Sequence, residues 1–368
     1  MYSRREFIFA SLGSLGAMAG LSSCSAESDS AGYQDVADRT WRHGEPAAGD
    51  KAALMRELVR YATLAPSSHN TQCWKFHLGE GAVSILPDFS RRCPAVDPDD
   101  HHLFVSLGCA AENLAQAALA HGLMGHAGFD VAAGNVLRVT LEPTSPVESA
   151  LFKAIVERQS TRAEYDRHPL ARQELDLLVK AGTGRGVEVI LLTQRQTMEQ
   201  VLEYVVQGNT AQMNDPAFVE ELKQWIRFSS DAAVRTGDGL YAASSGNPPL
   251  PTWLGSLLFG LFFTPKREND KYAKQVRSSA GIAVFVSDTP GPAQWVEVGR
   301  CYERFALQAA ALGIRNAMLN QPVEVATLRP QFAGFLGLGA RRPDLVVRFG
   351  HGPRLPPSLR RPVEAVMI

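Results

Sequence analysis

The chain has 368 residues, of which 45% are apolar and 20% charged, a composition typical of a soluble globular protein with one large domain or two smaller ones. Its formal net charge of -1 at pH 7 gives no reason to expect nucleic acid or an anionic membrane surface as a partner. We therefore expect the partner to be a small molecule.

Residues 1–24 are predicted to be an export signal and not part of the fold. Residues 3–8 read Ser-Arg-Arg-Glu-Phe-Ile, a twin-arginine motif, and the apolar run over residues 7–21 is too short and too rich in glycine and alanine to span a bilayer. Residues 21–24 resemble a bacterial lipobox, which makes Cys24 the expected lipid anchor, and membrane association is expected through that anchor only. Cleavage without lipidation, the alternative, would leave a free protein. The predicted location is periplasmic, either free or as a membrane-anchored lipoprotein.

The signal also bears on the chemistry. The twin-arginine route exports proteins that have already folded, so a cofactor made in the cytoplasm has to be bound before export. The motif therefore favours a cofactor-containing protein.

Residues 25–50 are rich in Ser, Ala, Gly, Asp and Glu and are predicted to be a flexible tether. Apolar residues then recur at helical spacing, which predicts a helix that begins near Lys51. Pro66 ends this helix, because proline lacks a backbone N–H and forces the preceding residue out of helical geometry. The apolar positions of the helix are Leu54, Leu58, Ala62 and Ala65.

The polar loop that follows, residues 65–74, is the most informative stretch of the chain. Ser67, Ser68, Asn70 and Gln72 place short donors and acceptors within six positions, which suits a heterocycle with alternating carbonyl and N–H groups. Trp74 would supply an apolar wall. The simpler alternative is a turn rich in local hydrogen bonds between side chains and backbone.

The next segments predict a hairpin and a central helix. Residues 74–78 and 82–86 alternate as strands around a Gly-Glu-Gly turn, and residues 102–122 are apolar or small almost all round, as in a buried helix. His101 and His102 lie beside Asp97, but no further histidine follows at the spacing of helical metal ligands. We therefore expect a solvated helix cap and no metal.

An internal repeat relates this central helix to a second one. Gly108, Glu112 and Gly122 recur without a gap 191 residues later as Gly299, Glu303 and Gly313. A second pairing, of residue 65 with residue 181, has an offset of 116, so the second copy is expected to contain an insertion of 75 residues at about 204–279. The chain is predicted to hold two copies of one α+β unit, residues 51–150 and 151–368.

The two copies carry different polar motifs. The second copy opens with Arg158, Ser160 and Arg162, and two guanidinium groups with a hydroxyl can converge on a dianionic phosphate. A solvated basic turn is the alternative. The first copy has Arg42 alone near the matching place, and the second copy has Gly-Thr-Gly-Arg at 182–185 in place of the polar loop after Pro66.

These motifs together resemble the nitroreductase family of FMN enzymes, and within it the Acg-type branch of fused halves. Residues 66–74 resemble the family's Pro-Ser-Ser-X-Asn-X-Gln-Pro-Trp signature, with Cys73 where that pattern has proline. The Arg-X-Ser-X-Arg motif at 158–162 resembles the segment that grips the FMN phosphate. Residues 319–322 resemble the stretch along the flavin ring, and residues 360–364 a terminal pattern whose basic residue, Arg361, also reaches the phosphate.

The resemblance implies an α+β, nitroreductase-like fold of two pseudo-twofold-related halves, each with a mixed or antiparallel sheet and a central buried helix. In family homodimers one subunit holds the phosphate and the other contributes the Pro-Ser-Ser loop, so one FMN is expected between the halves of a monomeric pseudo-dimer. The residues implied to bind FMN are Pro66, Ser67, Ser68, Asn70, Gln72, Arg158, Ser160, Arg162, Leu319, Asn320 and Arg361.

The implied activity is that of an FMN-dependent oxidoreductase, which transfers hydride through flavin N5 from NAD(P)H or another donor to a nitroaromatic, quinone or similar acceptor. No catalytic side chain is required. The alternative is an FMN-binding or sequestering protein with a covered site and little turnover. The aromatic segment 253–263 of the insertion is either a lid over the flavin or an arm that wraps the other half.

Four cysteines follow the signal. Cys73, Cys93, Cys109 and Cys301 form no CxxC motif. Export would permit disulfides, and the sequence leaves their pairing open.

Overall fold

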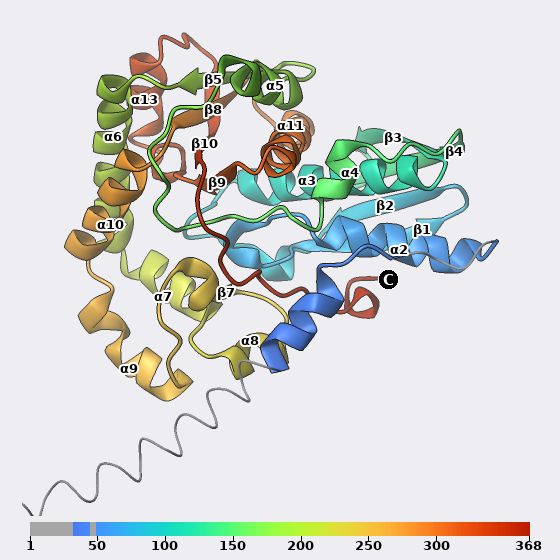
Figure 1. Ribbon diagram of the computed structural model, residues 1–368, viewed down its shortest axis with the longest axis horizontal. Helices are drawn as coiled ribbons and strands as arrows, with labels where there is room; N and C mark the ends of the chain where they lie inside the picture. The colour runs from blue at the N-terminus through green and yellow to red at the C-terminus, as the bar shows by residue number, and fades with distance from the viewer. Residues whose placement is uncertain (1–31, 45–48) are drawn as a thin grey trace, which may run out of the picture.

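The computed structural model describes residues 32–44 and 49–368 and contains two four-stranded sheets with helices packed around them (Figure 1). The predicted export signal and Cys24 lie outside the described residues. The predicted α+β class is confirmed, since helices accompany two four-stranded sheets in which every strand pair is antiparallel.

The first half places a hairpin and a second strand pair around one central helix. Its sheet has the strand order β1-β2-β4-β3. The Asp50 carboxylate caps the first helix by accepting a hydrogen bond from the Ala53 N–H at 2.9 Å, and Gly81 closes the hairpin with a φ of 60°. The elements are α2 (Lys51–Thr63), β1 (Trp74–Gly79), β2 (Ala82–Pro87), α3 (His101–Ala120), β3 (Leu123–Asp130) and β4 (Val136–Pro143).

The second half repeats this topology strand for strand. Its sheet has the order β5-β8-β10-β9, so β5, β8, β9 and β10 take the places of β1, β2, β3 and β4, and α11 takes the place of α3. The two sheets thus share one strand order, as expected of two copies of one unit. The elements are α4 (Ala150–Ala154), α5 (Arg172–Gly182), β5 (Val187–Leu192), β8 (Gly281–Ser287), α11 (Pro292–Ala311), β9 (Arg315–Met318), α12 (Gln321–Glu324), α13 (Arg329–Phe335) and β10 (Arg342–Gly350).

The insertion separates β5 from β8, whereas the equivalent strands β1 and β2 are joined by a tight turn. It starts at α6, earlier than the predicted position 204, and forms an outer layer on the left and lower side of Figure 1. Its elements are α6 (Arg195–Met213), α7 (Pro216–Trp225), β6 (Ile226–Arg227), α8 (Ser230–Thr236), β7 (Leu240–Tyr241), α9 (Thr252–Phe262) and α10 (Pro265–Arg277).

The two halves meet where α3 packs on α11. A Cβ atom at Gly108 would lie 2.0 Å from the carbonyl oxygen of Val296, and one at Gly299 would lie 1.9 Å from that of Val105. These are equivalent contacts, because residues 105 and 296 are also 191 positions apart. Glycine at both positions therefore lets the two backbones touch.

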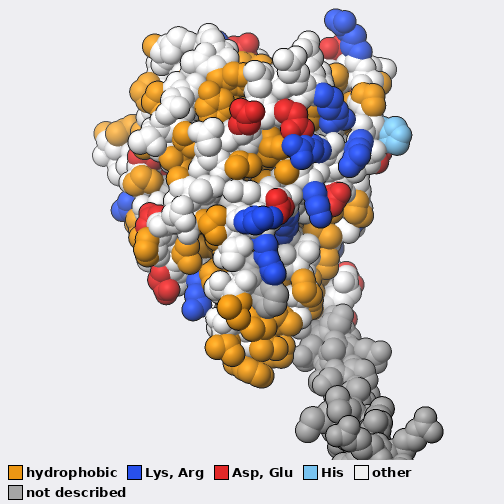
Figure 2. All heavy atoms as spheres, turned by 90° about the vertical axis from the view of Figure 1, so that its left-hand side faces the viewer, with side chains coloured by type: hydrophobic (Ala, Val, Ile, Leu, Met, Phe, Trp, Pro, Cys, Tyr) orange, Lys and Arg blue, Asp and Glu red, His pale blue; other side chains and the backbone are white. Residues whose placement is uncertain are grey.

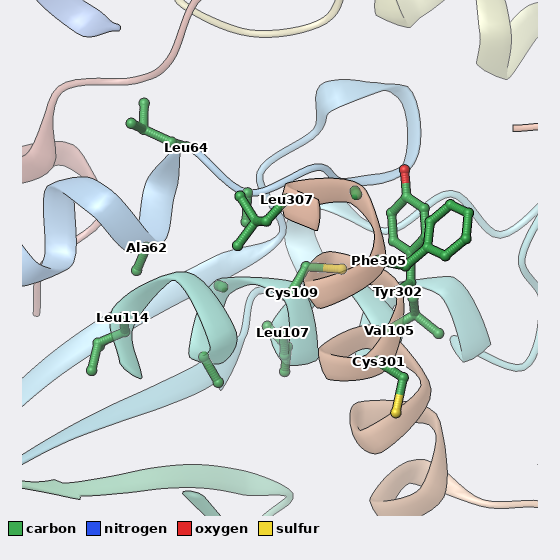
Figure 3. Close-up of a cluster of buried hydrophobic side chains, with 14 of the residues drawn as sticks. Ala62, Leu64, Val105, Leu107, Cys109, Leu114, Cys301, Tyr302, Phe305 and Leu307 are labelled. Atoms are coloured by element: carbon green, nitrogen blue, oxygen red, sulfur yellow. The ribbon is translucent and has the colours of Figure 1, made fainter. Parts of the chain in front are cut away.

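Apolar side chains from both central helices form one continuous core (Figure 3). Val105 and Leu107 of α3 and Tyr302 and Phe305 of α11 belong to it, together with Leu64 at the end of α2. Helix α3 is long and apolar enough to span a membrane, but 78% of its apolar stretch is buried inside the protein. It is the core helix of the first half, as predicted.

Residues 32–40 form a helix, so the prediction of a flexible tether over 25–50 is wrong for this part of the chain. Tyr33 and Ala37 are buried against the insertion, where the Tyr33 and Tyr241 rings lie 4.6 Å apart. The Trp41 indole N–H donates to the Ser358 carbonyl at 2.9 Å. The sequence signal for this helix is the apolar pair Tyr33 and Ala37, four positions apart, which the polar composition of the segment obscures.

Substituting Gly108 tests the central contact. Gly108→Ala is expected to lower the free energy of unfolding by about 3 kcal/mol or more, because the methyl group would overlap a backbone carbonyl that cannot rotate away. Gly334→Ala in α13 is the matched control, since nothing lies within 4 Å of its added methyl group. Urea denaturation of both variants measures the difference, and equal stabilities would contradict the assigned contact.

Candidate functional site

A cavity of about 750 Å³ is lined by both halves, by the insertion and by the segment before the C-terminus. This volume lies in the range of sites for small molecules and cofactors. The loop at residues 66–70 and helix α3 contribute from the first half, residues 158–162 and Tyr302 from the second, and helices α6, α7, α9 and α10 from the insertion. The polar motifs of the two halves thus meet at one cavity.

The loop after α2 is held in an unusual backbone conformation. His69, Asn70 and Gln72 have φ values of 49°, 53° and 53°, in the left-handed region that residues other than glycine seldom adopt. The Gln72 N–H donates to the Ser67 hydroxyl at 2.9 Å, and the Asn70 amide donates to the Gly239 carbonyl of the insertion at 3.0 Å. Contacts with the insertion therefore help to hold the loop at the cavity wall.

Arg360, and not the predicted Arg361, lies in this wall. Its guanidinium donates to three carbonyl oxygens at the end of α2 and to the Asn70 side-chain oxygen at 3.0 Å. These carbonyls have no partner within their own helix, so Arg360 caps α2. Burial lowers the pKa of Arg360 to about 9. Arg361 donates to the Ala365 carbonyl at 2.8 Å and lies outside the wall.

Arg158 lines the cavity, but its guanidinium interacts with a carboxylate and a backbone carbonyl of the protein itself. Its Nε lies 3.1 Å from Glu303 Oε1 on α11, and its Nη2 donates to the Leu64 carbonyl at 2.8 Å. Burial raises the pKa of Glu303 to about 7, and the nearby Arg158 opposes that shift. Arg158 therefore joins the two halves at the edge of the cavity, where the sequence predicts a phosphate ligand.

Arg162 is the cation of the motif that stays available. Within residues 32–44 and 49–368, no group makes a hydrogen bond or ion pair with its guanidinium, which borders the cavity. Lys271 of α10 borders the same cavity, where burial and the Arg162 charge lower its pKa. The Ser160 hydroxyl lies in the wall beside them, so this corner can bind an anion. Glu268 is the acid of this corner, and burial raises its pKa.

The motif reaches the cavity from an extended segment. Ser160 pairs with Asn316 of β9 as a short parallel bridge, and the Thr161 N–H donates to the Asn316 carbonyl at 2.8 Å. The fully buried Arg348 donates to the carbonyl oxygens of Thr161 and Ala163 at 3.0 and 2.8 Å. In an extended chain, residues two apart share a face, which explains the Arg-X-Ser-X-Arg spacing.

The structure brings eight of the eleven predicted residues to the cavity wall and leaves three outside it. The three outside it are Arg361, Gln72 and Leu319. Gln72 and Leu319 are buried elsewhere, and the Gln72 amide donates to the Gly237 carbonyl at 2.8 Å. Gln72 therefore joins the loop to the insertion. The eight residues in the wall are Pro66, Ser67, Ser68, Asn70, Arg158, Ser160, Arg162 and Asn320.

The prediction of a solvated cap at His101 and His102 is wrong, since both rings are buried. The ligand atoms of Asp97, His101 and His102 lie within 4.8 Å of one another. His101 Nε2 is 2.9 Å from Asp344 Oδ1, His102 Nε2 is 3.0 Å from the Asn320 amide, and the two Nδ1 atoms are 3.3 Å apart. Each ring nitrogen already has a polar neighbour, so the cluster is a hydrogen-bonded network next to the cavity.

The insertion is both a cover and an arm. Phe228, Phe259 and Phe263 line the cavity, as a lid would, while the ion pair between Arg91 and Asp238 ties the insertion to the first half.

Sequence reasoning missed several wall residues. Lys271 lies in a strongly charged helix that reads as solvated, and His69 was the unassigned position of the loop motif. The missed residues include Trp41, His69, Cys109, Phe228, Lys271, Tyr272, Gln321 and Arg360.

The four cysteines in the described part of the chain are free and buried. Cys109 reaches the cavity wall, whereas Cys73 packs in the core and does not. Burial raises the pKa of the Cys73 thiol to about 12, so it is a neutral thiol.

The chain is similar over most of its length to two curated proteins of Mycobacterium tuberculosis. It is 25% identical over 329 residues to "Putative NAD(P)H nitroreductase Rv3131", covering 86% of this chain and 91% of that protein. It is 21% identical over 327 residues to "Putative NAD(P)H nitroreductase acg", and the match covers 85% of this chain and 95% of that protein. The resemblance predicted from the motifs is thereby confirmed in two named relatives.

Other comparisons are more distant. No protein-family model matches the chain. A solved structure of a nitroreductase with bound FMN from Desulfitobacterium hafniense aligns with 60% of this chain and 99% of its own, with 16% identity and a TM-score of 0.39.

The electrostatic coupling of His69 to Arg162 can be measured. Burial, and then the Arg162 charge, lower the pKa of His69 from its ordinary 6.5 to about 4. Arg162→Gln removes a positive charge beside the imidazole, so the pKa of His69 is expected to rise, but to stay below 6.5 because burial remains. Histidine NMR titration measures this, with His69→Asn to identify the signal. Arg172→Gln, whose side chain is 94% exposed, is the control, and an unchanged His69 titration in Arg162→Gln would contradict the coupling.

Proposed function

We propose that the protein is an FMN-dependent oxidoreductase of the nitroreductase type. The observation that carries the proposal is the single cavity bordered by Ser67 and Ser68 of the first half and by Ser160 and Arg162 of the second. The names of the two relatives support the same activity and favour it over simple flavin storage. Because one chain supplies both sides of the cavity, we propose that a single chain makes a complete site.

The groups around the cavity fit FMN. The unpartnered Arg162 guanidinium, the Lys271 ammonium and the Ser160 hydroxyl would hold the phosphate. The Gln321 side-chain oxygen is buried, has no hydrogen-bond partner within residues 32–44 and 49–368, and belongs to a residue of the cavity wall, so it would accept from an N–H of the ring. The hydroxyls of Ser67 and Ser68 would add donors. In this assignment Arg158 and Arg360 hold the loop and the motif in position through their hydrogen bonds to backbone carbonyls.

When bound, FMN supplies the redox chemistry by accepting hydride at N5 and passing it to an acceptor. The chain's own part is to bind and to exclude water. Phe228, Phe259 and Phe263 cover the cavity with apolar surface, which lowers the local dielectric. Arg162 and Lys271 keep this corner positively charged, which favours a bound anion. We propose NAD(P)H as the donor and a nitroaromatic or quinone as the acceptor.

Removing the available cation is expected to weaken binding of the cofactor. Arg162→Gln should raise the Kd for FMN about tenfold to a hundredfold, since a charge-assisted hydrogen bond contributes roughly 1.5–3 kcal/mol. Quenching of FMN fluorescence on titration into the apoprotein measures the Kd. Arg172→Gln on the exposed face of α5 is the matched control and should bind as the unmodified chain does. Equal affinities in Arg162→Gln and the control would contradict the assigned phosphate site.

Reduction of the bound flavin tests the activity itself. Mixing the FMN-loaded chain with NADH or NADPH under anaerobic conditions is expected to bleach the flavin absorbance, and adding a nitroaromatic or a quinone should restore it. A flavin that stays oxidised with both nucleotides but is bleached by dithionite would contradict the NAD(P)H-dependent activity. A chain that binds no FMN would contradict the whole proposal.

A further inference from the structure

Helix α9 presents an apolar stripe on the outside of the protein. The side chains of Trp253, Leu257 and Leu261 are 70%, 69% and 68% exposed, the three highest values among the large hydrophobic residues of the described chain. They recur every four residues and so lie along one face of the helix. Figure 2 shows hydrophobic side chains gathered at the lower end of the molecule, where Figure 1 places α9. Such a patch marks an interaction surface.

The opposite face of α9 is firmly seated. A Cβ at Gly255 would lie 2.5 Å from a ring carbon of Phe228, so the helix is in direct contact with that ring. Phe259 stacks on Phe263 with ring centroids 4.7 Å apart and meets Phe228 edge-on at 6.2 Å. The inner face is therefore a wall of the cavity, and the outer stripe has no partner within the described residues.

The composition of α9 suits the surface of a lipid bilayer. The helix has no charged residue, and Lys266 and Arg267 follow it in the first turn of α10. An 11-residue helix is about 16 Å long, roughly half the hydrocarbon thickness of a bilayer, so α9 can lie along the surface but cannot cross. Tryptophan and leucine on one face with flanking cations are typical of helices that lie in the membrane interface.

The start of the described chain lies at the same end of the molecule. Tyr33 packs on Ala233 of α8, and Figure 1 shows α8 and α9 along the lower end. The lipid anchor predicted at Cys24 is eight residues before residue 32, a span of at most roughly 29 Å when fully extended. An anchor at Cys24 would therefore hold the end that carries α9 close to the bilayer.

A second copy of the chain fits the stripe less well. A stable interface buries roughly 800 Å² per partner, mostly from 20 to 30 residues. The outer face of α9 offers three large side chains. We propose that the Trp253, Leu257 and Leu261 stripe of α9 docks into the surface of a phospholipid bilayer, beside the lipid anchor. This proposal does not depend on the proposed redox activity.

Vesicle binding of the full chain with Cys24→Ser, which removes the anchor, tests the stripe alone. The probe is vesicles of phosphatidylcholine with a minor fraction of phosphatidylglycerol. Replacing Trp253, Leu257 and Leu261 together by glutamine is expected to lower the partition coefficient at least tenfold. Val131→Gln with Val147→Gln is the matched control, because these side chains are 62% and 49% exposed on the first half. Equal binding by the triple variant and the control would overturn the proposal.

A local readout keeps the test decisive if the triple variant folds poorly or the N-terminal apolar run binds vesicles by itself. The emission of Trp253, taken as the difference between the Cys24→Ser chain and the same chain with Trp253→Phe, should shift to the blue and be quenched by brominated lipids. An unshifted, unquenched Trp253 would overturn the proposal. A second pair of results would also overturn it: the chain sediments as a dimer but the triple variant does not, and the chain does not bind vesicles. The stripe would then bind a second copy of the chain.

Discussion

Helices α3 and α11 touch along their backbones at Gly108 and Gly299, and that contact sets how the two halves of the chain face each other. Because the contact is repeated in equivalent positions of the two halves, it places the two sheets in a pseudo-twofold arrangement. The loop after α2 connects that helix to β1 in the first half, and Ser160 pairs with Asn316 of β9 in the second. One close approach thereby brings two motifs, each found in one half alone, to the same cavity.

The charges around the cavity divide into two groups with different roles. Arg158, Arg348 and Arg360 are almost completely buried, and each donates to backbone carbonyls or lies beside a carboxylate. A buried cation is tolerated only when its donors are satisfied, so these three arginines stabilise the loop and the motif. Arg162 and Lys271 border the cavity. The Arg162 guanidinium has no partner among the described residues, and the Lys271 ammonium, which donates to the Ser245 carbonyl at 3.3 Å and to the Asn247 side-chain oxygen at 3.1 Å, has a third N–H for a ligand. The same separation of roles explains why a motif arginine need not be a phosphate ligand.

The insertion makes two halves with the same sheet topology unequal. It carries the aromatic cover of the cavity on one face of α9 and an exposed apolar stripe on the other. It also hydrogen-bonds the strained loop through the Gly237 and Gly239 carbonyls. The aromatic residues over the cavity, the contacts that hold the loop after α2 and the exposed stripe of α9 therefore all belong to one segment, which has no counterpart in the first half.

Local patterns were enough to predict α2, the β1–β2 hairpin, the central helices and the duplication, because helix periodicity, proline and repeated glycine spacing act over short stretches of chain. The family resemblance of the motifs named eight residues that lie in the cavity wall. Whether Arg360 or Arg361 faces the cavity, and whether His101 is solvated or buried against Asp344, depended on partners more than 200 positions away. Residue type and spacing along the chain determined which groups could form a site. The packing of α3 on α11, and of the insertion on both halves, decided which of these groups can still contact a ligand, because a buried polar group is held by whichever distant partner satisfies it.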